Sequence, residues 1–382
     1  MKSNIRLLRK LHLSAKYRVE PSRFFALIQK LPKKLIKNRN SKKLSNPMKC
    51  LIAALFALVV IMIAVAIGSV YIPPSDVVNI IFGQGSNVEH NSAAIVWNLR
   101  LPRALLAFAA GAALSVSGAV MQSILRNPLA SPFTLGVSSG ASLGAASVIL
   151  LGMTIPFAGP LTLPLAGFMG GLLTILFALS FAARIDVRMD NHVVILVGMV
   201  FSLFVNAITT LIMAMSHEHM QRMIFWQMGS FSMRDWQAVY ILAPVAFFGA
   251  LFIFFYHREL DIMTFGEETA RAMGINLKKV KWFLLVASAA MTGSVIAFAG
   301  VIGFVDLVAP HVVRKIFKAD HRWVIPMSAV VGGAFMVLCD LVARTIASPR
   351  ELPVGAVTAM IGAPFFAYVY LGKSGRIKSV KA

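Results

Sequence analysis

The sequence predicts an all-α polytopic membrane protein with about ten transmembrane helices and both termini in the cytoplasm. Three observations support this fold class. Hydrophobic residues make up 58% of the chain and charged residues only 14%, whereas soluble domains carry about 25% charged residues. Apolar runs of about 20 residues, the length that a helix needs to cross a bilayer, recur along the chain. The basic residues gather in alternate loops, as they do on the cytoplasmic side of membrane proteins.

The apolar runs define the expected spans in order. Pro73 and Pro74 end the first run, and Trp97 marks the outer interface before the second. The second and third runs are rich in glycine, alanine and serine, which allow helices to approach closely. The eighth is shorter than the others and follows the seventh directly. The expected spans are 50–70, 100–125, 133–152, 160–182, 193–215, 237–256, 282–300, 301–313, 324–343 and 354–371.

The net charge of +22 lies mostly outside the apolar runs. Fifteen of the 37 Lys and Arg residues fall in residues 1–49, where Glu20 is the single acid. Ten spans place this arm, the basic loops and the tail on one side, which fits an anionic membrane surface. Nucleic-acid binding is not expected, because no stacking aromatic residues lie among the basic residues of the loops. The expected domains are a basic cytoplasmic N-terminal extension (1–49), a ten-helix membrane domain (50–372) and a basic cytoplasmic tail (373–382).

The segment 260–275 is the one mid-chain stretch that is not predicted to lie in the membrane. Thr264 and Gly266 offer a helix start, two carboxylates lie in the first turn, and Gly274 is suited to a left-handed cap. The pattern predicts a short capped helix in a cytoplasmic loop. It is either a solvated connector or a docking helix for a soluble partner.

Five blocks of sequence resemble the FecCD-type permeases of bacterial ABC importers, which take up iron-siderophores, haem and cobalamin. The blocks are RLPRALLAFAAGAALSVSGAVMQSILRNPLASPFTLGVSSGASLG (100–144), FWQMGSFS (225–232), GEETARAMG (266–274), APHVVR (309–314) and RELPVGAVTAMIGAPFF (350–366). They occur in the order and spacing of that family, and the resemblance covers about residues 50–372.

The resemblance implies a multi-pass transport subunit of the bacterial cytoplasmic (inner) membrane, not an enzyme. Its partners would be a second permease (identical or homologous), two cytoplasmic ATPase subunits, an extracytoplasmic substrate-binding protein and membrane lipid. No cofactor is expected in this chain, because ATP and Mg²⁺ would bind to the partner ATPase. Ferric siderophore is the first expectation for the substrate, before haem and cobalamin.

The resemblance also implies roles for individual residues, set by matching positions. The ATPase-coupling helix would carry Gly266, Glu267, Glu268, Ala270, Arg271 and Gly274. Docking of the binding protein would use Arg100, Arg103 and Arg344. Asp190, Asn191 and His192 are candidates for the inner gate, although a polar helix start explains them equally well.

Asp306 departs from the pattern, because that family usually has glycine or an apolar residue at this position. An ionisable side chain at membrane depth is costly and often marks a functional site. Asp306 is therefore a candidate for the transport pathway, or it pairs with a nearby arginine or with His311.

Other signals are weaker. Gly372-Lys373-Ser374 echoes a phosphate-binding loop, but Ala367 stands where the first glycine is required. His217-Glu218-His219 has the wrong spacing for one helix face, so no metal site is expected. Two other classes stay open: a membrane-embedded enzyme, and a secondary transporter driven by an ion gradient through Asp306 and Asp340.

Overall fold

The computed structural model describes residues 45–68, 70–83, 90–156, 158–215 and 219–381. The extension expected at 1–49 therefore falls almost wholly outside the described residues. Asn46–Ala382 form one compact unit, and its described residues form helices and loops without strands, which confirms the all-α class. The helices are α3 (Asn46–Ala66), α4 (Pro74–Ile81), α5 (His90–Ile95), α6 (Leu101–Ile124), α7 (Val137–Ile149), α8 (Thr162–Ile185), α9 (Asn191–Met215), α10 (Met220–Met228), α11 (Trp236–Phe255), α12 (His257–Thr264), α13 (Glu267–Ala272), α14 (Leu277–Ala299), α15 (Val305–Phe317), α16 (His321–Thr345) and α17 (Val354–Lys381).

Seven helical segments in the described part of the chain are long and apolar enough to cross a membrane. The remaining three expected spans correspond to α7, α15 and α17. Both α7 and α15 have 13 residues, about 20 Å of helix, which is shorter than the roughly 30 Å hydrocarbon core. The seven segments are Asn46–Ala66, Asn91–Ile124, Gly159–Ile185, Asn191–Met215, Trp236–Phe255, Leu277–Ala299 and His321–Thr345.

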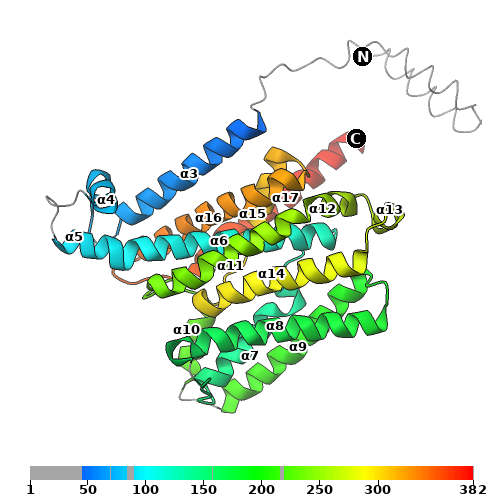
Figure 1. Cartoon of the computed structure of the whole chain (residues 1–382), viewed down its shortest axis with the longest axis horizontal. Helices are drawn as coiled ribbons and strands as arrows, with labels where there is room; N and C mark the ends of the chain where they lie inside the picture. Colours follow the sequence, from blue (N-terminus) through cyan, green and yellow to red (C-terminus); the bar gives the residue numbers. More distant parts are fainter. Residues whose placement is uncertain (1–44, 69, 84–89, 157, 216–218, 382) are drawn as a thin grey trace, which may run out of the picture. The chain divides into compact units, whose positions relative to one another are not determined.

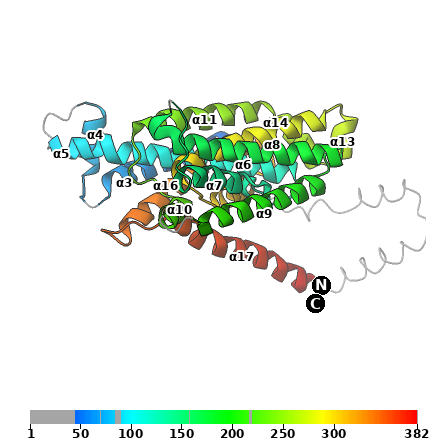
Figure 2. The same ribbon diagram turned by 90° about the horizontal axis from the view of Figure 1, so that it is seen from below.

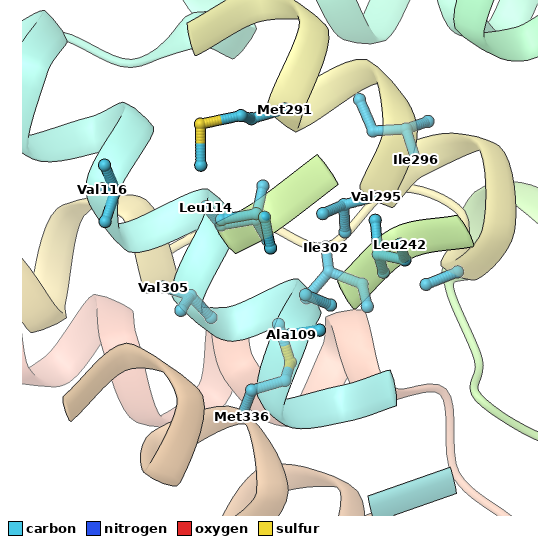
Figure 3. Close-up of a cluster of buried hydrophobic side chains, with 14 of the residues drawn as sticks. Ala109, Leu114, Val116, Leu242, Met291, Val295, Ile296, Ile302, Val305 and Met336 are labelled. Carbon is cyan, nitrogen blue, oxygen red and sulfur yellow. The ribbon is translucent and has the colours of Figure 1, made fainter. Parts of the chain in front are cut away.

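Helix α6 lies at the centre of the unit, between α15 and α16 on one side and α11 and α14 on the other (Figure 1). In its apolar segment 83% of the residues are buried, against 22% for α3 at the periphery. Figure 3 shows the core that results, in which Leu114 of α6 lies near Leu242 of α11 and Val295 of α14. Many apolar side chains of α3, α9 and α11 are exposed, among them Leu55, Leu203 and Phe247, as is typical of helices that meet lipid.

Two glycines allow α6 to approach its neighbours closely. A Cβ atom on Gly111 would clash with the carbonyl oxygen of Gly332 in α16, and one on Gly118 would clash with the carbonyl oxygen of Asp306 in α15. Helices in lipid gain little from burying apolar surface against each other, so this close backbone packing is a main source of their association. The small residues noted in the second span thus form helix–helix contacts.

The seventh and eighth expected spans are separated by a break in the helix. Gly300 ends α14 with a φ of +74°, and Phe304 has a φ of +68° before α15 begins. The first residues of the expected 301–313 span are therefore an extended linker, and the helix continues to Phe317 instead. The carbonyl of Ala299, in the last turn of α14, accepts a hydrogen bond from the amide of Ser230 at 2.8 Å.

Helix α13 and the α4–α5 segment lie at opposite ends of the unit in both views (Figures 1 and 2). We call these the α13 end and the α5 end. The candidate residues from the sequence divide between them, so the site has two parts.

Candidate functional site

The expected capped helix is present as α13. It begins after Gly266, whose φ of +124° few other residues adopt, and it is followed by Gly274 with a φ of +83°. The amide of Gly274 donates to the carbonyl of Arg271 at 3.0 Å. Thr264 does not start this helix, because it is the last residue of the preceding helix, α12.

The side chains of α13 divide into an inward and an outward set. Ala270 is fully buried, and Glu267 is 19% exposed. Glu268 and Arg271 are exposed, although Arg271 also donates to the Glu267 carboxylate at 3.3 Å. The helix therefore presents one acidic and one basic side chain to a partner while its opposite face is anchored.

Lys281 of α14 anchors Glu267. Its Nζ atom donates to Oε1 of Glu267 at 2.7 Å, to Oδ1 of Asn191 at 2.8 Å and to the carbonyl of Met189 at 2.7 Å. The lysine is fully buried, and its three acceptors match the three donors of an ammonium group. Lys281 lies close in sequence to the exposed Lys278 and Lys279, and its burial was not predicted.

The turn between α8 and α9 is held by its own carboxylates. Asp186 accepts hydrogen bonds from the amides of Asp190 and Arg188, at 2.8 and 2.9 Å, and these bonds lower the pKa of its carboxyl group. Asp190 accepts from the amide of His192 at 2.8 Å. Met189 has a φ of +52° and is fully buried. The candidate gate residues therefore sit on a turn with a defined conformation.

The coupling candidates and the gate candidates line the same cavity. It measures about 500 Å³ and lies at the α13 end. The structure thus brings together two sets of residues that the sequence assigned to separate roles. Its lining includes Asp190, Asn191, His192, Gly266, Glu267, Glu268 and Arg271, together with Arg126, Asp186, Arg188, Phe265 and Thr269.

A second polar cluster at the α13 end was not anticipated. His321 lies between Asp261, whose Oδ1 is 2.6 Å from Nδ1, and Ser123, whose Oγ is 2.6 Å from Nε2. Arg314 donates to the same Ser123 hydroxyl at 2.8 Å. These residues come from α12, α16, α6 and α15. They are distant in sequence, so no local sequence pattern predicts the cluster.

The cluster has the residue types of a hydrolase triad but not the environment of a nucleophile. The Ser123 hydroxyl is also 2.8 Å from the carbonyl of Ala119, one turn earlier in α6, and it accepts from Arg314. A serine activated by histidine needs its proton directed at the ring. This hydroxyl lines a cavity of about 180 Å³ with His321 and Arg314, but it also donates to a backbone carbonyl. The cluster therefore joins four helices, and it does not favour the hypothesis of a membrane-embedded enzyme.

At the α5 end, the three expected docking arginines make contacts within the chain. Arg100 is 6% exposed, and its guanidinium donates to the carbonyls of Val65 and Ala66, at 3.0 and 2.8 Å, and to that of Val70. It therefore holds the end of α3. Arg344 donates to the carbonyl of Ala64.

Arg103 forms the strongest ionic contact at this end. It binds both oxygens of Asp340, with the shortest separation at 2.8 Å, and donates to Glu351 at 2.8 Å. Asp340 is 2% exposed and also lies 3.7 Å from Arg344. A carboxylate that forms ion pairs with two arginines is already occupied by cations, so Asp340 does not favour the ion-gradient hypothesis.

A second cavity, of about 510 Å³, opens at the α5 end. Arg100, Arg103 and Arg344 line it together with Glu351 and Arg234. Arg234 makes no hydrogen bond to any described residue, and its Nε is buried without a partner. Arg234 lies two residues after the FWQMGSFS block, but it was not predicted as a site residue.

Asp306 lies in the first turn of α15, with only 1% of its surface exposed. One carboxylate oxygen accepts from the Ser131 hydroxyl, and the other has no partner among the described residues. Asp306 lines neither of the two cavities described above.

The weaker sequence signals resolve as follows. Gly372-Lys373-Ser374 continues α17 and is not a loop. His217 and Glu218 lie outside the described residues. Within the residues that the structure describes, no three His, Cys, Asp or Glu side chains are grouped to hold a metal, and Cys339 is a buried free thiol.

Comparisons with known proteins agree with these features. A profile of the FecCD transport family matches residues 55–372. The uncharacterized ABC transporter permease protein YvrB of Bacillus subtilis is 39% identical over 321 residues, which are 83% of this chain and 91% of YvrB. The vitamin B12 import system permease protein BtuC of Klebsiella pneumoniae is 33% identical over 326 residues, which are 84% of this chain and 93% of BtuC.

A solved metal-chelate-type ABC transporter in an inward-facing conformation superposes with a TM-score of 0.74 at 27% identity, covering 86% of this chain and 99% of that one. The relatives are ABC transporter permease subunits, which are not enzymes and have no ATP-binding site of their own. Together with the apolar helices, they establish an integral membrane protein. The chain, an ABC importer permease, therefore belongs to the FecCD transport family.

Proposed function

We propose that this permease carries a ferric siderophore across the bacterial inner membrane, as one of two permease subunits, identical or homologous, around a central path. Two ATPase subunits, which bind ATP and Mg²⁺, would seat at the α13 end. An extracytoplasmic binding protein would dock at the α5 end. The chain itself would hold no cofactor and bind no nucleic acid.

The observation that carries the proposal is the anchoring of α13. Glu267 and Ala270 fix its inner face, while Glu268 and Arg271 stay exposed. A rigid helix with a free, charged outer face transmits a rigid-body movement from a partner, which a mobile loop does not. A carrier driven by an ion gradient has no need of such a helix.

Ten spans with both termini in the cytoplasm agree with the location of the basic loops. The cavity lined by Arg188 and Arg271 brings loops 184–190 and 258–281 to the α13 end. The contact of Asp261 with His321 brings the loop 314–322 there as well. Clustering of basic loops on one side is the arrangement of cytoplasmic loops.

The binding protein would meet the cavity at the α5 end. The cavity is lined by Arg100, Arg103, Arg234 and Arg344, and Arg100 also holds the end of α3. Cations at an interface with an acidic partner mainly speed and orient the encounter. Arg234, whose Nε has no hydrogen-bond partner among the described residues, is the cation best suited to a new contact.

The iron-siderophore assignment rests on the relatives. Curated relatives are named as permeases for Fe(3+)-citrate, hemin and vitamin B12, and the solved neighbour is of the metal-chelate type. All of these ligands are large chelates or macrocycles of a metal. Iron chelates are the first expectation among them.

The proposal is tested by co-purification and uptake. ATPase subunits should co-purify with the wild-type chain and be lost with the double substitution Glu268→Ala and Arg271→Ala, while Arg258→Ala, exposed on the neighbouring α12, should retain them. Vesicles containing the complex and its binding protein should take up radioactive iron as a ferric hydroxamate in an ATP-dependent manner. Uptake of ferric citrate, hemin or cyanocobalamin in its place would correct the substrate, and uptake without ATP would reject the importer.

A further inference from the structure

Lys281 is a fully buried cation shared by two segments with different proposed roles. Glu267 belongs to α13, the helix that would meet the ATPase. Met189 and Asn191 belong to the segment 186–191, which contains two of the candidate gate residues, Asp190 and Asn191. All three acceptors lie within 2.8 Å of Nζ, so every donor of the ammonium group is used.

Each partner of Lys281 is also anchored independently. Glu267 accepts from Arg271 at 3.3 Å within α13. The side-chain amide of Asn191 donates to the carbonyl of Ile124, in the last turn of α6, at 3.0 Å. Neither segment therefore depends on Lys281 for its own conformation, and the lysine adds the connection between them.

This connection has no parallel nearby. In the part of the chain that the structure describes, no other hydrogen bond or ion pair joins α13 to the segment 186–191. The two segments otherwise face each other across the cavity of about 500 Å³. Without the lysine they could move apart or together at little cost in contacts.

We propose that Lys281 is a positioning residue that makes α13 and the segment 186–191 move as one body. The inference rests on the proposed function, because it is the ATPase that would move α13. A displacement of α13 is then passed through one buried ammonium group to Asp190, Asn191 and His192. Coupling of this kind requires a contiguous physical link with a defined geometry, which the three hydrogen bonds supply.

The test measures the distance between the two segments. Spin labels are placed at Val187 and Met273, both exposed, after Cys50→Ser and Cys339→Ala remove the native thiols. Distances are recorded by pulsed electron paramagnetic resonance for the full chain alone and for its complex with the ATPase, with ATP and vanadate as the probe. We expect one narrow distance for the wild type, unchanged between the nucleotide-free and trapped states.

Lys281→Met should abolish that single narrow distance, whereas Lys278→Met, the same change at an exposed position one turn earlier on α14, should leave it intact. The Lys281→Met complex should still hydrolyse ATP but lose ATP-driven uptake. A narrow, state-independent distance in Lys281→Met overturns the proposal, and so does parallel loss of hydrolysis and uptake, which indicates a purely structural role.

If Lys281→Met does not insert into the membrane, Asn191→Ala replaces it. Because Met189 still accepts from the lysine in Asn191→Ala, this variant is combined with Glu267→Ala, which removes the acceptor on α13. The double variant should broaden the distance, and an unchanged distance overturns the link. Failure of the ATPase to co-purify with the wild type would contradict the proposed function instead. The two failures are distinguishable, because the distance in the chain alone does not depend on the ATPase.

Discussion

His321 contacts one carboxylate oxygen of Asp261 twice, through its backbone amide at 2.9 Å and through its ring Nδ1 at 2.6 Å. The contact joins the start of α16 to α12, the helix directly before α13. An ionised carboxylate can only accept, so Nδ1 carries the proton in this pair. The orientation of α12 therefore depends on the charge of Asp261.

This contact predicts an acid-dependent loss of stability. Burial favours the neutral acid, but the side-chain and backbone hydrogen bonds from His321 outweigh it and lower the pKa of Asp261 below its ordinary 3.8. A carboxyl group with a depressed pKa stabilises the fold above its ordinary pKa, and this stabilisation is lost as the pH falls through the lowered value.

We therefore expect the melting temperature in detergent to fall below about pH 4, and to fall less steeply in Asp261→Asn. Glu268→Gln, an exposed carboxylate changed to an amide on α13, is the matched control and should follow the wild type. Identical acid profiles for Asp261→Asn and the wild type would contradict the prediction.

The pair of Arg103 with Asp340 predicts unequal costs at the α5 end. Arg103→Ala leaves Asp340, 2% exposed, with a single arginine 3.7 Å away, and should destabilise the protein by about 3–5 kcal/mol because a buried charge loses its main partner. Glu351→Ala removes a carboxylate that is 37% exposed and should cost less than about 1 kcal/mol. Thermal unfolding of the two variants in the same detergent measures the difference, and equal costs would argue against the burial of the pair.

Arg234 predicts an effect on the rate at which the binding protein docks. Arg234→Glu reverses the charge of a side chain that lines the cavity at the α5 end, and whose Nε has no hydrogen-bond partner among the described residues. Association with the binding protein should slow by about tenfold at low salt and by less at high salt, since rim charges act mainly on the rate of encounter. Surface plasmon resonance measures this, with Arg222→Glu, exposed on α10, as the control. An equal loss in both variants would point to net charge instead of a specific contact.

Asp306 predicts a transport defect without an assembly defect. Asp306→Asn keeps the volume and the contact with Ser131 but removes the charge from a buried carboxylate that has one unpartnered oxygen. Uptake should fall while ATPase co-purification is retained, because Asp306 bonds to Gln122 and Ser131 and forms no hydrogen bond with α13 among the described residues. Unchanged uptake in both Asp306→Asn and Asp306→Gly would remove Asp306 from the transport pathway.

Local signals predicted the short capped helix α13 well. The start of α13 at Gly266 and its end at Gly274 follow from glycines in conformations with positive φ, and both are encoded within a few residues. The spans were predicted for the same reason, because a long apolar run specifies a membrane helix by itself. The short helix α7 was predicted as a full span, 133–152, because its flanking linkers are also apolar. The eighth segment was predicted to be short, but it begins and ends four residues later than expected.

The contacts that complete the site were not predictable in the same way. Lys281 did carry a signal, because it lies four residues after Leu277 and three before Leu284, on the buried face of α14. Its acceptors, however, come from segments 14 and about 90 residues away. The backbone carbonyls that hold Arg100 and the pairing of Asp261 with His321 are likewise products of tertiary packing.

The glycine contacts of α6 have a consequence for how the two ends communicate. At Gly111 and Gly118 the backbone of α6 lies so close to α16 and α15 that a Cβ atom does not fit between the helices. Its 24 residues therefore form a strut of constant length, about 36 Å. Asn191 binds near one end of this strut and Asp340 pairs with Arg103 near the other. A tilt imposed at one membrane surface must then appear at the opposite surface with its angle preserved.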